Sequence, residues 1–276
     1  VEGALVDCVY NPLAYAWQPH RAYLEMAGVG GAKTLLLGMN PGPHGMGQMG
    51  IPFAATAMVR NLLGIRDLHV EQPRTPHPKR PVSGLDWPKE EVSGTRLWGL
   101  LAEHYGDAEN ILSNVFLVNH CPLMLFAGER ATNITPDKIA GETARALLAR
   151  CDDHLREVVE MMEINTVIVV GRFAEKRAAA ALSGSKVEVK TCWHPSPASP
   201  LANKLAALIS MDRQIVTAAM RSTVIRVFMA AAMKWVLQAA LNYARYRTTA
   251  TCTKKSACLV GQITITSDRR QKKSMA

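Results

Sequence analysis

The chain has 276 residues, of which 48% are hydrophobic, so it can bury a substantial core as one domain with an appendage or as two small domains. Its six cysteines include no Cys-x-x-Cys pair, which argues against a structural zinc or iron–sulfur site and fits a reducing compartment. The formal charge of +9 comes from the C-terminal part: residues 204–276 carry thirteen Lys and Arg against Asp212 and Asp268, a balance of +11, so the first 203 residues carry −2. Overall basicity is therefore weak evidence that the main domain binds nucleic acid.

Along the chain, apolar β-branched runs alternate with helical spacing. Residues 5–17 form an aromatic, proline-punctuated arm ahead of the first strand, and residues 71–92 form a long proline- and charge-rich surface loop. Apolar runs predict strands at 34–37, 113–118, 166–170 and 187–192. Helical spacing predicts helices at 56–63, 93–104 with Ser93 as the cap, 133–162 and 171–182. This alternation implies a mostly parallel sheet that is covered on both faces.

The segment from Gly38 to Phe53 is the most unusual in composition. Five glycines and three prolines in sixteen residues predict a loop rather than a helix or a central strand. Residues that precede proline are restricted, so Asn40 is held stiffly just after an apolar strand, where α/β sheets bind ligands. No Gly-Lys-Ser/Thr follows, so the segment is not a P-loop. The alternative is an ordinary surface loop of turn-forming residues.

Three polar residues each follow a predicted strand: Asn40, Asn119 and His194. The carboxyl ends of parallel strands share one edge of a sheet, so these side chains can converge although they are far apart in sequence. Simpler alternatives exist for single residues. Asn119 could cap a turn before Pro122, His194 could be a hydrogen-bonded loop histidine, and Phe53 could belong to the core.

The motifs Gly-Met-Asn-Pro-Gly-Pro at 38–43, Asn-His-Cys-Pro-Leu at 119–123 and His-Pro-Ser-Pro at 194–197 occur together. With them, the chain resembles the single-strand-selective monofunctional uracil-DNA glycosylases over most of residues 9 to 204. The resemblance implies a three-layer α/β/α fold with a central, mainly parallel four-stranded sheet. Residues 1–204 would form the glycosylase domain, and residues 205–276 would be a divergent basic extension, partly helical or disordered.

The resemblance also implies an activity. It implies excision of uracil and 5-hydroxymethyluracil from single- and double-stranded DNA, without AP-lyase activity, metal or cofactor, by a monomeric nuclear enzyme. Asn40 would hold the attacking water, and His194 would hydrogen-bond the departing uracil O2. Phe53 would stack on the extruded base, and Asn119 would read its N3 and O4 edge. Backbone groups of Met39 and Gly42 would line the pocket, and Met46 would also bind the substrate. DNA contacts would come from Pro195, Ser196, Pro197, Ala198, Ser199 and Lys204.

The sequence departs from the family pattern at several places. His44 stands where relatives usually carry an aromatic residue, and Ala198-Ser199 replaces the Arg-Asn often found at the DNA wedge, so we expect more dependence on single-stranded or mismatched substrate. The family's closing Gly-Trp and terminal helix are absent after residue 205. An impaired nucleic-acid-binding module is therefore the alternative function. No apolar run approaches a membrane span, because Lys234 and Gln238 interrupt the richest one, 227–241.

Overall fold

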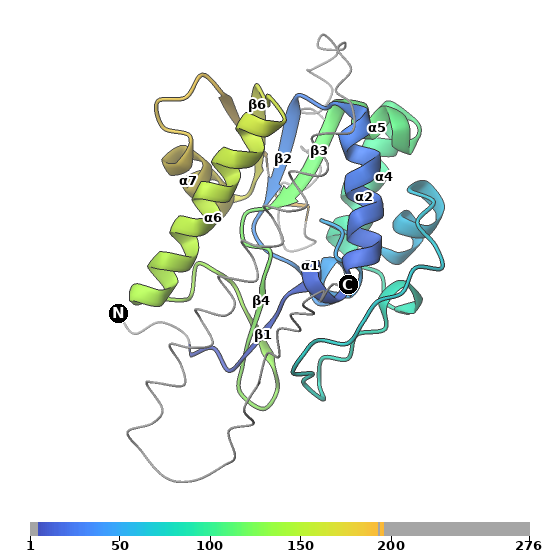
Figure 1. Cartoon of the computed structure of the whole chain (residues 1–276), viewed down its shortest axis with the longest axis vertical. Helices are drawn as coiled ribbons and strands as arrows, with labels where there is room; N and C mark the ends of the chain where they lie inside the picture. Colours follow the sequence, from blue (N-terminus) through green and yellow to red (C-terminus); the bar gives the residue numbers. More distant parts are fainter. Residues whose placement is uncertain (1–4, 193, 196–276) are drawn as a thin grey trace, which may run out of the picture.

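Four parallel strands form the centre of the fold. The structure is a computed structural model that describes residues 5–192, 194 and 195 (Figure 1). The sheet order is β3-β2-β6-β7, with the strands β2 (Thr34–Gly38), β3 (Val115–Asn119), β6 (Thr166–Val170) and β7 (Glu188–Cys192). Every residue of β6 is buried, as expected for a β-branched strand covered on both faces. The predicted parallel sheet is confirmed.

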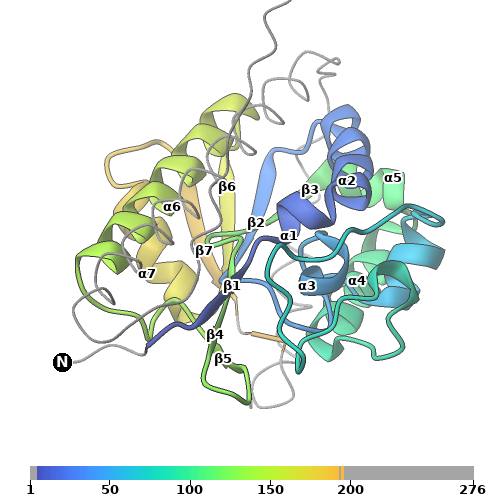
Figure 2. The same cartoon turned by 60° about the horizontal axis from the view of Figure 1, so that its bottom comes forward.

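Helices cover both faces of this sheet. Figures 1 and 2 show one layer on each side of it: α6 (Glu142–Met161) with α7 (Arg172–Ala181), and α2 (Trp17–Gly30) with α4 (Val92–Tyr105) and α5 (Ala108–Asn114). The three-layer α/β/α architecture is thus as predicted. Shorter helices are α1 (Pro12–Tyr15), α3 (Met46–Met49), the π-helix η1 (Met58–Leu62) and the 3-10 helix η2 (Gly84–Asp86).

Tyr23 joins the helical layer to the outer strand β3. Its ring is fully buried and stacks on Phe116 at a centroid distance of 5.8 Å. Its hydroxyl donates to the Leu117 carbonyl at 2.8 Å and accepts from the Leu117 N–H at 3.0 Å. An outer strand exposes backbone groups that need partners when they are buried, and one side chain supplies both here. The helix α2 therefore fixes the strand that carries Asn119.

A second, antiparallel sheet was not predicted from the sequence. It has the order β1-β4-β5, with β1 (Cys8–Tyr10), β4 (Met124–Ala127) and β5 (Thr132–Ile134). The prediction that residues 133–137 open the long helix is wrong, because Ile134 pairs with Leu125 in this sheet. The helix α6 begins at Glu142 instead, after Gly141, whose φ of 90° lies in the region that favours glycine.

Three other local predictions are wrong. The glycine-rich segment does contain one helical turn, α3, which ends at Gly50 in the left-handed conformation. Glu91 rather than Ser93 caps α4, since its carboxylate accepts from the Ser93 N–H at 3.1 Å. Residues 113 and 114 complete α5, so β3 starts at Val115. The predicted character of residues 205–276 lies outside the described residues. Among the described residues, no helix has the length and apolar content needed to span a membrane.

Candidate active site

The candidate site lies along the carboxyl edge of the parallel sheet. Gly38 and Asn119 are paired at the ends of β2 and β3, and Asn40 follows β2 by two residues. His194 follows β7 by two residues, and its Cβ and Cδ2 lie 3.9 and 4.0 Å from the position of a Cβ on Gly171, which follows β6. Asn40, Asn119 and His194 thus lie at or just beyond the carboxyl ends of three of the four parallel strands, β2, β3 and β7, along one edge. Asn119 ends one outer strand, β3, whereas His194 follows the other outer strand, β7, and its side chain lies beside Gly171 after β6.

Phe53 and Asn119 meet over Gly38. A Cβ on Gly38 would lie 2.1 Å from Asn119 Oδ1 and 2.6 Å from Phe53 Cζ, so only glycine leaves room for both side chains. Asn119 is buried, and its Nδ2 donates to the Met46 sulfur at 3.1 Å. Phe53 adopts φ 54°, a strained conformation for a bulky residue that costs on the order of 1–3 kcal/mol and clusters at functional sites. The structure therefore brings Phe53, Asn119 and Met46 together, and all three were singled out from the sequence.

Backbone hydrogen bonds connect the start of the glycine-rich loop to the residues after β3. The His120 N–H donates to Gly38 O and the Cys121 N–H to Met39 O, both at 2.9 Å. This extends the pairing of β2 with β3 beyond the strands themselves. Met39 is consequently fixed beside Asn119 and its neighbours. Asn40 is partly buried, and its Nδ2 donates to the Pro41 carbonyl at 3.3 Å.

Gly42 faces Glu91, a residue to which sequence reasoning gave no role of its own. A Cβ on Gly42 would lie 3.6 Å from Glu91 Oε2, and the Gly42 carbonyl accepts from the Gly47 N–H at 3.0 Å. Burial raises the pKa of the Glu91 carboxyl, and its hydrogen bond from the Ser93 N–H acts in the opposite direction. Glu91, the cap of α4, thus places an acidic side chain against the glycine-rich loop.

His194 is partly buried, and burial lowers the pKa of its imidazole. The neutral form therefore prevails near neutral pH. Arg96 on α4 fixes the next residue, because its Nη1 donates to the Pro195 carbonyl at 3.1 Å. The other predicted DNA-contacting residues, Ser196, Pro197, Ala198, Ser199 and Lys204, lie outside the described residues.

A buried group of three polar side chains next to the carboxyl edge of the sheet was not predicted from the sequence. His120 Nε2 lies 2.8 Å from Asp152 Oδ1, and Arg177 Nε donates to the same oxygen at 3.0 Å. Asp152 sits on α6 and Arg177 on α7, so this group ties both helices to the residue that follows Asn119. Sequence offered no sign of it, because Asp152 adjoins the apolar face of an amphipathic helix. Within the described residues, no three His, Cys, Asp or Glu side chains group to hold a metal ion.

Comparisons with known proteins show the family to which the chain belongs. Residues 27–214, more than half of the chain, match the model of the uracil DNA glycosylase superfamily. The single-strand selective monofunctional uracil DNA glycosylase of Bos taurus is 43% identical over 76% of this chain and 77% of its own length. The Rattus norvegicus protein of the same name is 44% identical over 72% of both chains. A crystal structure of Pedobacter heparinus SMUG2 is 16% identical with a TM-score of 0.49, and the match covers 88% of this chain and 93% of that one. The chain therefore belongs to the uracil DNA glycosylase superfamily and, within it, to the single-strand selective monofunctional uracil-DNA glycosylases.

Proposed function

We propose that this DNA glycosylase excises uracil and 5-hydroxymethyluracil from single- and double-stranded DNA. It extrudes the nucleotide, hydrolyses the N-glycosidic bond and leaves an abasic site. The observation that carries the proposal is the packing of the Phe53 ring and the Asn119 amide against the same glycine, Gly38. An aromatic face and a two-way amide are what a flipped pyrimidine needs, one for stacking and one for its polar edge.

Stabilisation of the leaving group carries most of the catalysis. Breaking the bond leaves a sugar cation and a uracil anion, so a donor aimed at uracil O2 acts where negative charge develops. Neutral His194 can donate its N–H there, and such a donor contributes roughly 3 kcal/mol. The amide of Asn40 does not take up a proton near neutral pH, so it orients the water rather than deprotonating it. Bond breaking therefore runs ahead of water attack.

Asn119 supplies the selectivity for uracil. Its carbonyl can accept from N3–H and its NH₂ can donate to O4, whereas cytosine presents the opposite groups at both positions. The Nδ2 group that now faces the Met46 sulfur turns to O4 when the base enters, exchanging a weak acceptor for a strong one. Stacking on Phe53 contributes on the order of 1–3 kcal/mol, which offsets part of the few kcal/mol spent on extrusion.

A base-release assay tests this function with the wild-type protein and with Asn40→Ala and His194→Ala. We expect wild type to release free uracil from single-stranded DNA, and each variant to lose at least a hundredfold in single-turnover rate while it still binds DNA. Hydroxymethyluracil and duplex substrates test the wider substrate range. Wild-type protein that binds DNA but releases no base would contradict the proposal and favour the impaired binding module.

A further inference from the structure

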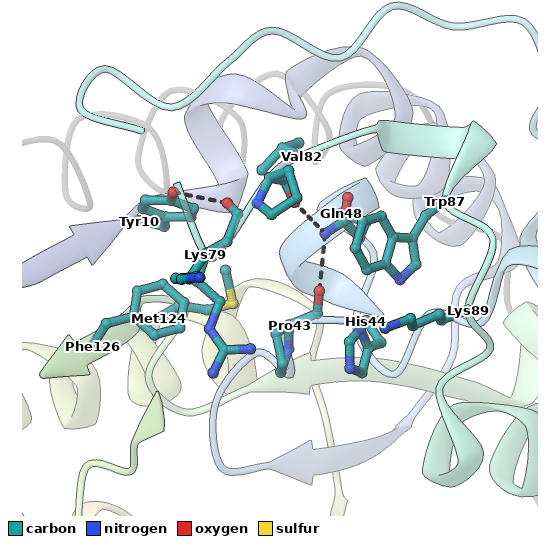
Figure 3. Close-up of a pocket in the computed structure, with 12 residues that line it drawn as sticks. Tyr10, Pro43, His44, Gln48, Lys79, Val82, Trp87, Lys89, Met124 and Phe126 are labelled. Atoms are coloured by element: carbon teal, nitrogen blue, oxygen red, sulfur yellow. Dashed lines mark hydrogen bonds between the residues drawn. The ribbon is translucent and has the colours of Figure 1, made fainter. Parts of the chain in front are cut away.

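A second hollow lies beside the glycine-rich loop, apart from Asn119. It has a volume of about 200 Å³. Its walls come from the loop and α3 (Pro43, His44, Gln48), from residues 79–89, and from the small sheet (Tyr10, Met124, Phe126). Figure 3 shows one lysine on each side, Lys79 near Phe126 and Lys89 near His44. We call it the lysine pocket. At about 30 Å³ per water, it has room for a phosphate group or a single ring.

The frame of the lysine pocket is held by hydrogen bonds. Gln48 is its central support: Nε2 donates to the Pro43 and Pro81 carbonyls at 3.0 and 3.1 Å, and Oε1 accepts from the Ser83 N–H at 2.8 Å. The Arg80 guanidinium donates twice to the Ala131 carbonyl, at 2.9 and 2.7 Å. The hollow therefore exists before any ligand arrives, which reduces the entropy lost on binding.

The charge around the lysine pocket is positive. Three cations, Lys79, Arg80 and Lys89, line it, and no Asp or Glu is among its described lining residues. Both lysines are exposed, and neither ammonium group makes an ion pair or a hydrogen bond with any residue that the structure describes. Burial lowers the pKa of His44, and Lys89 and Arg80 lower it further. These cations stand out in a part of the chain with a balance of −2 over its first 203 residues, so they select an anionic ligand.

The lysine pocket is close to the site of base release. His44 follows Asn40 by four residues, so their Cα atoms are at most about 14 Å apart. A DNA strand advances about 3.4 Å per nucleotide when stacked, so this distance corresponds to about four nucleotides or fewer. The helix α3 separates the two places, with Met46 contacting Asn119 and Gln48 lining the lysine pocket. The lysine pocket therefore lies within reach of a strand whose extruded base meets Asn119.

We propose that the lysine pocket binds the phosphodiester backbone of the substrate strand, within about four nucleotides of the extruded base. This rests on the proposed function and adds a subsite to it. Lys79 and Lys89 contact the phosphate as point charges, and the flat His44–Trp87 pair, stacked at 5.6 Å, forms an aromatic wall for the adjoining sugar or base. Through this subsite the enzyme binds the DNA strand beyond the lesion, so kcat/KM depends on the length of the strand.

The test compares the double variant Lys79→Gln/Lys89→Gln with a charge-matched control, Lys176→Gln/Lys186→Gln. The control lysines are exposed, one on α7 and one before the amino end of β7. Single-stranded substrates carry one uracil and are extended stepwise on the 5′ or the 3′ side. For wild type and control, we expect kcat/KM to rise with extension on one side. For the pocket variant, kcat/KM should fall about tenfold on the long substrate and less than twofold on the shortest. The slope of its log binding constant against log salt concentration should become shallower by about 0.7 per lost phosphate contact.

Several outcomes would overturn the subsite. One is equal behaviour of the two double variants at every length; another is an equal loss on short and long substrates. Inhibition by inorganic phosphate that the pocket variant relieves, without any length dependence, would indicate a free-anion site instead. If wild type releases no base, the proposed function fails, and anisotropy with uracil-free oligonucleotides then decides the subsite alone. There the pocket variant should bind long strands about tenfold more weakly than the control, and equal binding would refute the subsite.

Discussion

Gly38→Ala tests the reading of the site most directly, because it adds one methyl group at the point where two proposed base contacts meet. The Cβ would lie 2.1 Å from Asn119 Oδ1, and 2.6 and 2.9 Å from the Phe53 ring carbons Cζ and Cε2. Ordinary contacts begin near 3.5 Å, so the amide must move by about 1.4 Å and the ring by about 0.9 Å. The helix α3 and the tight packing of Phe53 leave little space for either to withdraw.

The expected loss follows from these displacements. A misplacement of about 1 Å can lower a rate by about a hundredfold, since the reacting groups no longer meet in productive geometry. Overpacking a close-packed region also costs about 1–3 kcal/mol of stability. Gly38→Ala should therefore lower the single-turnover rate of uracil release by about a hundredfold, with a modest fall in Tm. The rate should fall far more than the folded fraction at the assay temperature.

The matched control is Gly99→Ala, the same substitution at a helical glycine of α4. A Cβ there meets nothing within 4 Å, so the variant should keep the wild-type rate and gain about 0.5–1 kcal/mol from reduced backbone entropy. Circular dichroism melting and burst kinetics on the same preparations give both quantities. Gly38→Ala that releases uracil within threefold of wild type, at an unchanged Tm, would refute the account of Phe53 and Asn119.

Three further predictions concern pH, the buried polar group and strandedness. Burial lowers the pKa of both His20 and His154 to about 4, so below pH 6.5 the unfolded chain binds protons that the folded chain does not; stability should fall with acid by up to about 1.4 kcal/mol per pH unit for each, measurable by urea unfolding at pH 7.5 and 5.5. Asp152→Asn removes the carboxylate that Arg177 contacts, so the free energy of unfolding at pH 7.5 should fall by about 2–4 kcal/mol in the same assay, and an unchanged free energy of unfolding would contradict this. Because Ala198-Ser199 replaces the Arg-Asn that the family resemblance leads us to expect at the DNA wedge, we expect faster uracil release from single strands than from a U·A duplex, and a strong duplex preference would contradict this.

The parallel sheet could be predicted from the sequence, whereas the helix α2 and the small antiparallel sheet could not. The strand β6 could be predicted to the residue, because five buried apolar or β-branched residues need no tertiary context. The helix α2 was missed because Pro19 suggests a break, although a first-turn proline costs a helix no hydrogen bond. The strand β5 is three residues long and is stabilised by pairing with β4, a contact that no local pattern encodes. Local propensity thus fails where short segments depend on distant partners.

The candidate site divides in the same way. Asn40, Asn119 and His194 could be placed on one edge, because a parallel sheet puts the carboxyl ends of its strands together. The close approach of Phe53 and Asn119 to Gly38 could not be predicted, since it depends on the return of the loop through α3. The contact of His120 with Asp152 was equally hidden, because the helix α6 reads as an ordinary amphipathic pattern. The topology of the sheet thus determines which residues lie along its carboxyl edge, whereas tertiary packing determines which of their side chains come into contact.

The sheet itself limits how this site can vary. Asn119 ends one outer strand, β3, and His194 follows the other, β7, by two residues, so the width of the sheet between these strands, which is nearly constant in proteins, limits where the two residues can lie. Loop changes cannot alter this width without disrupting the sheet. Differences in the accepted base or strand must therefore arise in the segments that approach the rim from outside it. In this chain those segments are the glycine-rich loop, with Gly42 against Glu91, and the lysine pocket beyond α3. Substitutions in the lysine pocket should change substrate range while leaving bond cleavage intact.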